Sequence, residues 1–132
     1  MNVEQLEIIE DVRGKLIAIE NLKNIPFEIK RVYFLFGTRS NAERGSHSHI
    51  SLRQMLIAVS GSCFVTLDDG SQTAKVKLGC PSQSLMVEPG VWHEMSQFSE
   101  DCVLLVLASD HYRESDYIRD YNQFLQSKSP ND

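Results

Sequence analysis

The chain has 132 residues, which is room for one compact domain and not for two, so we expect a single domain over residues 1–132. Hydrophobic residues make up 42% and charged residues 23%, a balance that excludes an intrinsically disordered protein. Thirteen Lys and Arg against eighteen Asp and Glu give a formal net charge of −5, which argues against nucleic-acid binding through a broad basic face. An anionic small molecule held by a few local arginines is compatible with this charge.

The cysteines and the apolar runs predict the cellular compartment. Cys63, Cys80 and Cys102 cannot all pair within one chain, and no C-x-x-C spacing indicates a zinc knuckle or a redox pair. The first residues contain no continuous apolar stretch of the kind found in secretory signals. The longest apolar run, residues 103–108, is far too short to span a membrane. We therefore expect reduced cysteines, a cytoplasmic location and no membrane association.

Most of the chain consists of short β-branched or alternating segments separated by turn residues, at the spacing of a sandwich or barrel. Gly14, Gly61 and the turn Asp68-Asp69-Gly70 each stand between two such segments and predict hairpins. The predicted strands cover residues 6–10, 15–20, 29–36, 53–60, 63–67, 73–78, 84–87, 92–98 and 102–108, and residues 37–45 form a loop.

Helical periodicity occurs only near the C-terminus. Tyr117, Ile118, Tyr121 and Leu125 follow helical spacing, which predicts a short amphipathic helix over residues 115–126 with Ser115 as its N-cap. Residues 127–132 are expected to fray. A sheet of so many antiparallel strands must protect its edges, and closure into a double-sheet jelly roll is the common solution. We therefore expect an all-β fold, a cupin-type double-sheet jelly-roll barrel with a short C-terminal helix and a ligand site in its open mouth.

Two stretches carry the candidate chemistry. His47 and His49 are two residues apart, so in an extended segment both imidazoles project from the same face. The turn that ends in His93 supplies a third histidine. The two stretches together match the cupin pattern, which is H-x-H, an acidic residue five positions on, a glycine after seven more, and later a P-x-G-x-x-H-like turn. Gln54 departs from it because metal-binding cupins have a glutamate there, and Glu88 departs because the turn usually begins with proline.

These histidines allow two kinds of chemistry. Three neutral imidazoles can hold Zn²⁺ or Fe²⁺ with open positions, although an amide at Gln54 binds a cation more weakly than a carboxylate does. Without a metal, imidazoles serve as acids and bases near neutral pH. Each residue also has an ordinary interpretation: His93 and Trp92 as packing at a barrel rim, and the arginines as solvated surface charges.

Several motifs together resemble the sugar-nucleotide 3,4-ketoisomerases over about residues 6–124, in order and with little gap. They are R-G-x-H-x-H at 44–49, N-I-P-F-E-I-K-R-V-Y-F-L-F at 24–36, V-S-G-S-C-F-V-T-L-D-D-G at 59–70, P-G-V-W-H-E-M at 89–95 and V-L-A-S-D-H-Y-x-E-x-D-Y-I-R-D-Y at 106–121. These enzymes convert dTDP-4-keto-6-deoxyglucose into a dTDP-3-keto-6-deoxyhexose, on the way to amino sugars of bacterial surface polysaccharides. The resemblance implies an enzyme without metal or other cofactor, and a homodimer that exchanges N-terminal strands.

The resemblance also implies roles for individual residues. His49 resembles the base at C3 of the sugar, and His47 and Tyr33 would move protons at O3, O4 or C4. Arg44, next to the histidine pair, would neutralise the charge of an enediolate or a phosphate. Such a shift of a ketone needs a base near C3 and a donor near O4, which imidazoles and a phenol can supply.

The nucleotide half of the substrate needs other groups. A pyrophosphate favours planar, permanently charged donors, and Arg13 and Arg31 are the candidates. Trp92 is a candidate to stack on thymine, and His93 and Gln54 are candidates to face the sugar. Three other functions fit the same residues: a metal-free dTDP-sugar 3,5-epimerase, a metal-dependent dioxygenase-like cupin, and a cupin that binds a nucleotide sugar without turnover.

Overall fold

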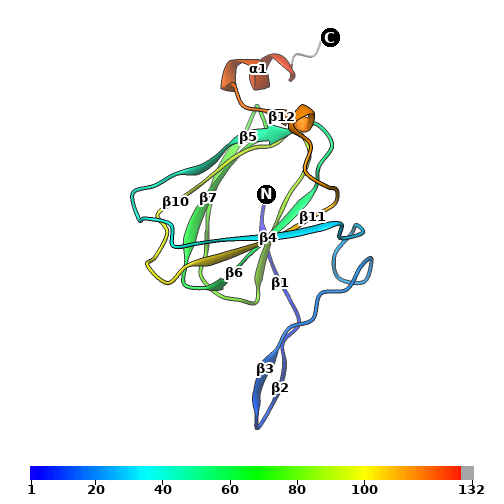
Figure 1. The fold of residues 1–132 in the computed structure, drawn as a ribbon, viewed down its shortest axis with the longest axis vertical. Coiled ribbons are helices and arrows are strands. Elements are labelled where there is room, and N and C mark those ends of the chain that lie inside the picture. The colour runs from blue at the N-terminus through cyan, green and yellow to red at the C-terminus, as the bar shows by residue number, and fades with distance from the viewer. Residues whose placement is uncertain (129–132) are drawn as a thin grey trace.

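The computed structural model describes residues 1–128, most of which lie in two five-stranded antiparallel sheets and their connections (Figure 1). One sheet has the strand order β1-β9-β6-β11-β4 and the other β12-β5-β10-β7-β8, while β2 and β3 pair only with each other. The elements are β1 (Val3–Gln5), β2 (Ile9–Asp11), β3 (Gly14–Leu16), β4 (Arg31–Phe36), β5 (Arg44–His49), β6 (Gln54–Ser60), β7 (Cys63–Asp68), β8 (Thr73–Leu78), β9 (Gln83–Val87), β10 (Trp92–Ser96), β11 (Val103–Ala108), η1 (Glu114–Asp116), β12 (Tyr117–Ile118) and α1 (Tyr121–Gln126).

The core lies between the two sheets and follows from the alternation of apolar residues along the strands. Leu104 and Val106 of β11 face Val65 and Leu67 of β7 across this core, and all four side chains are buried. Because side chains alternate along a strand, each sheet presents an apolar face to the other. The arrangement confirms the expected all-β, cupin-type double-sheet jelly roll with one short helix.

The segment around Gly61 corrects one sequence-based expectation. β6 and β7 do not form a hairpin, because β6 pairs with β9 and β11 in one sheet and β7 pairs with β8 and β10 in the other. Gly61, with φ of +63°, is where the chain crosses between the sheets. A Cβ there would lie 2.3 Å from Ser99 Oγ and 2.7 Å from the Cys102 backbone nitrogen, so only glycine fits the crossing. The hairpin expected at residues 68–70 does form, between β7 and β8.

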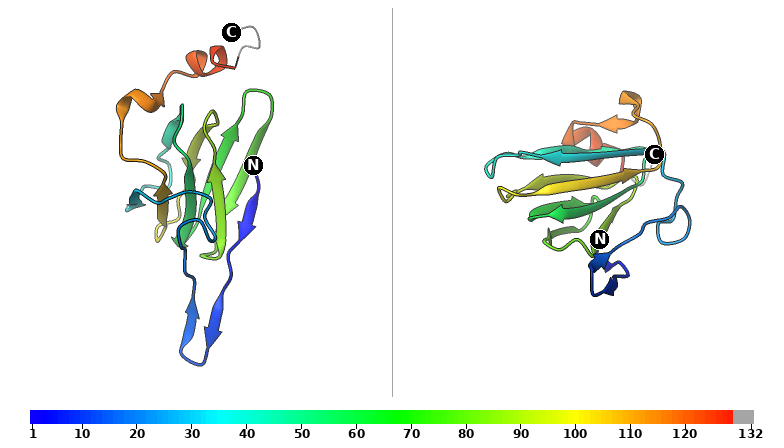
Figure 2. Two further views of the ribbon diagram at one scale, coloured as in Figure 1. Left: turned by 90° about the vertical axis from the view of Figure 1, so that its right-hand side faces the viewer. Right: turned by 60° about the horizontal axis from the view of Figure 1, so that its bottom comes forward.

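The N-terminal hairpin projects away from the two sheets (Figure 2). β2 and β3 turn around Gly14 as expected, but each strand has three residues, and residues 17–20 are not a strand. After the hairpin the chain returns along the outer face of the sheet that contains β6 and β11. There Ile25 and Phe27 are buried against Met55 and Ile57, which makes a second apolar cluster.

The C-terminal helix is shorter than predicted. It begins at Tyr121, and its N-cap is Asp120, whose side chain accepts a hydrogen bond from the Asn122 backbone N–H, so Ser115 is not the cap. The preceding residues form the turn η1 and the strand β12, which pairs with β5. An available strand edge thus outweighs the helical spacing of Tyr117 and Ile118. The expectation of fraying over 129–132 lies outside the described residues, and Ser127 and Lys128 form a hydrogen-bonded turn.

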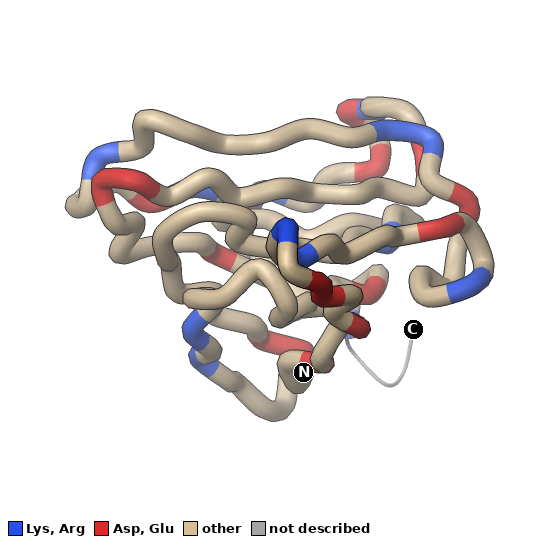
Figure 3. The backbone as a smooth tube through the Cα atoms, turned by 90° about the horizontal axis from the view of Figure 1, so that it is seen from below, with Lys and Arg blue, Asp and Glu red and all other residues tan. Residues whose placement is uncertain are grey.

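Acidic and basic positions are scattered along the backbone, with no large region of one sign, when the molecule is seen from below (Figure 3). This distribution agrees with the modest net charge of −5. Within residues 1–128, none of the helices has the length and apolar character needed to cross a bilayer.

Candidate functional site

Three histidines meet at one end of the barrel, on neighbouring strands β5 and β10. The antiparallel register places His93 directly opposite His47, and His49 follows two residues later on the same strand face. The ring centroid of His47 lies 4.9 Å from that of His49 and 4.7 Å from that of His93. His49 is 2% exposed and His93 is 1% exposed, so the cluster is largely closed to solvent.

A bulge next to the cluster explains the local sequence R-G-S-H. The register between β5 and β10 shifts at His93, and Gly45 and Ser46 have positive φ angles of 91° and 59°. A Cβ on Gly45 would lie 3.0 Å from the His93 carbonyl oxygen, which is a tight contact, and the positive φ angle disfavours any residue other than glycine. Bulges change the direction of side chains within a strand, and this one precedes the two histidines.

Burial keeps these imidazoles neutral. Desolvation, and then the neighbouring His47, lower the pKa of His49 to about 4. Desolvation also lowers the pKa of His93 to about 3 and shifts the pKa of His47 downward. At neutral pH all three rings can therefore accept a proton.

The same three residues are the candidate metal ligands of the described chain. One ligand atom from each of His47, His49 and His93 lies within 4.8 Å of the others, and no carboxylate or thiolate of residues 1–128 joins them. Gln54 is buried and donates from Nε2 to the Tyr33 hydroxyl at 2.8 Å. The donor set thus suits a divalent ion held by three imidazoles with open positions, and it equally suits proton transfer.

A cavity of about 520 Å³ opens beside His47 and collects several predicted site residues. Three arginines and one glutamate line it, so its charge favours an anionic ligand. The Arg31 guanidinium lies 5.1 Å from the Tyr33 ring centroid, and its Nε and Nη2 atoms are buried without a hydrogen-bond partner in the described part of the chain. The lining residues are Arg31, Tyr33, Leu35, Glu43, Arg44, Gly45, His47, Met95, Tyr112, Tyr117 and Arg119.

Two predicted binding residues lie elsewhere in this chain. Trp92 is buried away from the histidines, with its ring 5.3 Å from Tyr121 and 5.6 Å from Phe124, because alternation along β10 turns it to the opposite face from His93. The Trp92 ring packs under α1, so its faces are not open to a thymine base. Arg13 lies in the turn of the projecting hairpin, pairs with Asp11 and does not line the cavity of its own chain.

The structure also brings residues to the site that the sequence interpretation missed. Tyr117 packs edge-on against both histidines of β5, 4.3 Å from His49 and 4.9 Å from His47 between ring centroids. Asp116 lies next to His49, and Arg119 stacks on the Tyr117 ring at 4.3 Å. The helical spacing of Tyr117 led to its assignment as a packing residue of a helix. Asp116 lies in a polar connection, where an acidic residue does not by itself indicate a functional site.

Comparison with known proteins agrees with this geometry. The sequence model of the family FdtA (WxcM-like, C-terminal) matches residues 1–129. The TDP-4-oxo-6-deoxy-alpha-D-glucose-3,4-oxoisomerase of Aneurinibacillus thermoaerophilus is 54% identical over 114 residues, which are 86% of this chain and 82% of that protein.

Two solved structures share the whole architecture. A 3,4-ketoisomerase from Helicobacter canadensis is 45% identical, with a TM-score of 0.92 over 96% of this chain and 95% of that one. A histidine-to-asparagine mutant of the 3,4-ketoisomerase from Thermoanaerobacterium thermosaccharolyticum, in complex with TDP-4-keto-6-deoxyglucose, is 40% identical, with a TM-score of 0.92 over 96% and 91% of the two chains. Membership in one family accounts for both the sequence motifs and the histidine cluster: this chain belongs to the FdtA (WxcM-like, C-terminal) family of sugar-nucleotide 3,4-ketoisomerases.

Proposed function

We propose that the protein is an isomerase that moves the ketone of dTDP-4-keto-6-deoxy-D-glucose from C4 to C3, giving a dTDP-3-keto-6-deoxyhexose for deoxyamino-sugar synthesis. The observation that carries this proposal is the cluster of buried, neutral imidazoles at the edge of an arginine-lined cavity. Relatives that are 40 to 54% identical and carry this activity in their names support it. A cytoplasmic location, expected from the cysteines, stays a prediction.

The reaction needs a base, a proton donor and a stabilised oxyanion. The carbonyl at C4 acidifies the proton at C3, so a neutral imidazole can remove it and leave an enediolate. His49 is the proposed base, and His47 and Tyr33 return a proton at C4. Burial raises the pKa of Tyr33, which keeps its hydroxyl protonated, and the hydrogen bond from Gln54 fills an acceptor site of that oxygen and leaves its own proton free to be donated.

The two histidines of β5 hold different positions relative to the cavity. His47 lines it, whereas His49 lies behind the His47 and Tyr117 rings. His93 donates from Nδ1 to the Val91 carbonyl at 3.1 Å, and this hydrogen bond fixes the orientation of its ring next to His47.

The arginines suit the charged half of the substrate. Arg31 and Arg44 both line the cavity, and Arg31 has buried donors that lack a partner within residues 1–128. A bound pyrophosphate or enediolate would supply the missing acceptors. Arg13 would reach such a ligand only from the hairpin of a second subunit.

The products formed from dTDP-4-keto-6-deoxyglucose in deuterated water distinguish the candidate functions. We expect NMR to show a 3-keto sugar. A retained 4-ketone with deuterium at C3 and C5 would instead identify a 3,5-epimerase. Turnover that stops with a chelator and returns with a metal would identify a metal-dependent cupin, and binding without any turnover would identify a nucleotide-sugar-binding protein. Either of the last two results, like the epimerase result, contradicts the proposal.

We also propose that two chains form a homodimer by exchanging their N-terminal strands. A hairpin of two three-residue strands is not stable alone in water. The hairpin of β2 and β3 projects from the sheets and also exposes the apolar side chains of Ile9 and Leu16 (Figure 2). The outer face of the edge strand β4 is also apolar and exposed, with Phe34 at 56% and Phe36 at 69%. A second copy would bury both surfaces at once.

Light scattering after size-exclusion chromatography tests this assembly. The natural protein is expected to have the mass of two chains. Phe34→Lys places a charge in the proposed interface, so we expect a large shift toward the monomer. Leu125→Lys is the matched control, because Leu125 is an exposed apolar residue on α1, and it is expected to stay dimeric. A natural protein that runs as a monomer would contradict the proposal.

A further inference from the structure

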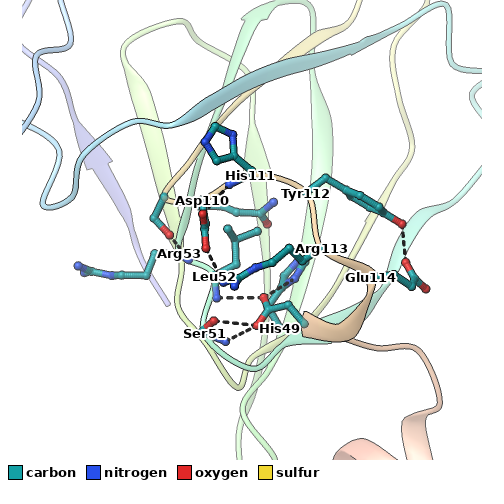
Figure 4. Close-up of polar contacts among 12 residues, drawn as sticks. His49, Ser51, Leu52, Arg53, Asp110, His111, Tyr112, Arg113 and Glu114 are labelled. Carbon is teal, nitrogen blue, oxygen red and sulfur yellow. Dashed lines mark hydrogen bonds and ion pairs between the residues drawn. The ribbon is translucent and has the colours of Figure 1, made fainter.

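Three hydrogen bonds from Ser51 and Leu52 fix the carboxylate of Asp116 beside His49. Oδ1 accepts from the Ser51 backbone N–H at 2.9 Å and from Ser51 Oγ at 2.8 Å, and Oδ2 accepts from the Leu52 backbone N–H at 3.2 Å. Figure 4 shows Ser51, Leu52 and His49 gathered around these bonds. His49 Nδ1 lies 3.4 Å from Asp116 Oδ2, and the Asp116 side chain is 13% exposed.

The backbone holds the carboxylate in this place. β12 pairs with β5 so that Tyr117 is opposite His49, and the Ile50 N–H donates to the Asp116 carbonyl at 2.9 Å. The Tyr117 ring then packs against the His49 ring from the side. The pairing of β12 with β5 therefore positions the Asp116 backbone, and the hydrogen bonds from Ser51 and Leu52 fix the orientation of its carboxylate.

The neighbours of the three imidazoles differ in one chemical respect. His93 Nδ1 contacts a backbone carbonyl, and His47 Nδ1 is buried without a partner in the described chain. Of these three, only His49 has a carboxylate within 4.0 Å of a ring nitrogen. The contact between His49 Nδ1 and Asp116 Oδ2 is close but does not meet hydrogen-bond geometry, and both nitrogens of the buried ring lack a hydrogen-bond partner within residues 1–128. A carboxylate accepts a hydrogen bond and so favours the proton on the ring nitrogen that faces it.

We infer that Asp116 is the positioning residue of the base: it holds His49 in the tautomer with the proton on Nδ1 and leaves the Nε2 lone pair free to take the C3 proton. This inference rests on the proposed ketoisomerase function. In the step it assists, the C3–H bond breaks, the proton moves to Nε2, C3 and C4 become doubly bonded, and the carbonyl electrons move to O4. The imidazolium that forms is then stabilised by the adjacent anion.

The distance of 3.4 Å fits this role in a free enzyme. Hydrogen bonds of catalytic groups are often long without substrate and shorten in the reacting complex. A charged ring attracts the carboxylate more strongly than a neutral one does, so the contact tightens when the proton arrives.

The variant Asp116→Asn tests the inference in the full-length enzyme. Its amide can still accept from Ser51, but an NH₂ group facing His49 favours the opposite tautomer. We expect kcat to fall about 10- to 100-fold, as for other residues that orient a functional histidine, with KM changed little because Asp116 does not line the cavity. The matched control is Asp110→Asn, a carboxylate of the same connection that pairs with Arg113, and it is expected to keep the natural kcat.

A second measurement does not require turnover. Long-range ¹H–¹⁵N spectra of the natural protein, labelled at histidine and assigned with the His49→Asn variant, are expected to show Nδ1 protonated and Nε2 unprotonated in His49. A proton on Nε2, or an Asp116→Asn enzyme that retains the natural kcat, would overturn the inference. Absence of ketoisomerase turnover in the natural enzyme would instead remove the proposed function, and the tautomer remains measurable if Asp116→Asn does not fold.

Discussion

The variant His49→Asn is expected to lower kcat by about 10² to 10⁴, the usual contribution of a general base, with only a modest change in KM. Asparagine approaches the shape of the imidazole and keeps a polar group at the site, but it cannot take a proton at neutral pH. Substrate binding depends mainly on the cavity, which His49 does not line. The loss should therefore appear in the chemical step, measured by the rate of 3-keto product formation.

His111 supplies the control for this experiment. It is the one histidine of the sequence outside the cluster, and it is exposed. His111→Asn makes the same chemical change and is expected to leave kcat unaltered. If the His49→Asn enzyme formed product at the natural rate, His49 would not be the base, and His47, which lines the cavity, would be the next residue to test.

The strands of the barrel could be predicted because their signals are local. The alternation in residues 73–78, the continuous apolar run in residues 103–108 and the turn residues between strands depend on near neighbours in sequence, and β8 and β11 match these segments. The partner of each strand is not a local property. Nothing within V-S-G-S-C-F distinguishes a hairpin at Gly61 from a crossing between sheets, and the contact that decides it is with Ser99.

The candidate site divides in the same way. The spacing of two residues places His47 and His49 on one strand face, so their convergence follows from sequence. The cupin pattern adds His93 as a third histidine, but its place opposite His47 depends on the pairing of β10 with β5. Asp116 and Tyr117 reach His49 only because β12 pairs with β5, a contact between residues far apart in the chain. A two-residue strand is too short to show a strand pattern in the sequence, so the helical spacing of residues 117–125 led to the prediction of a helix there.

Acidification is expected to destabilise the protein between about pH 6.5 and pH 4, because the buried histidines resist protonation. The pKa of His49 falls to about 4 and that of His93 to about 3 in the folded state, against 6.5 for an ordinary imidazole. The unfolded chain therefore binds more protons in this window, so the free energy of unfolding decreases as the pH falls. Each such histidine contributes a slope of roughly 1.4 kcal/mol per pH unit while the two states differ by one proton.

Denaturant unfolding at fixed protein concentration, repeated at several pH values between 7 and 4.5, measures this slope. His93→Gln removes one titrating group and can retain a donor toward the Val91 carbonyl, which accepts from His93 Nδ1 in the natural protein. The variant will be less stable overall, so the slopes are compared and not the absolute values. We expect the slope of the free energy of unfolding against pH to be smaller in the variant by roughly 1.4 kcal/mol per pH unit, which corresponds to the uptake of one proton fewer on unfolding. Equal slopes in the two proteins would mean that His93 accepts a proton as readily when folded as when unfolded, which its complete burial among two other imidazoles and a backbone carbonyl argues against.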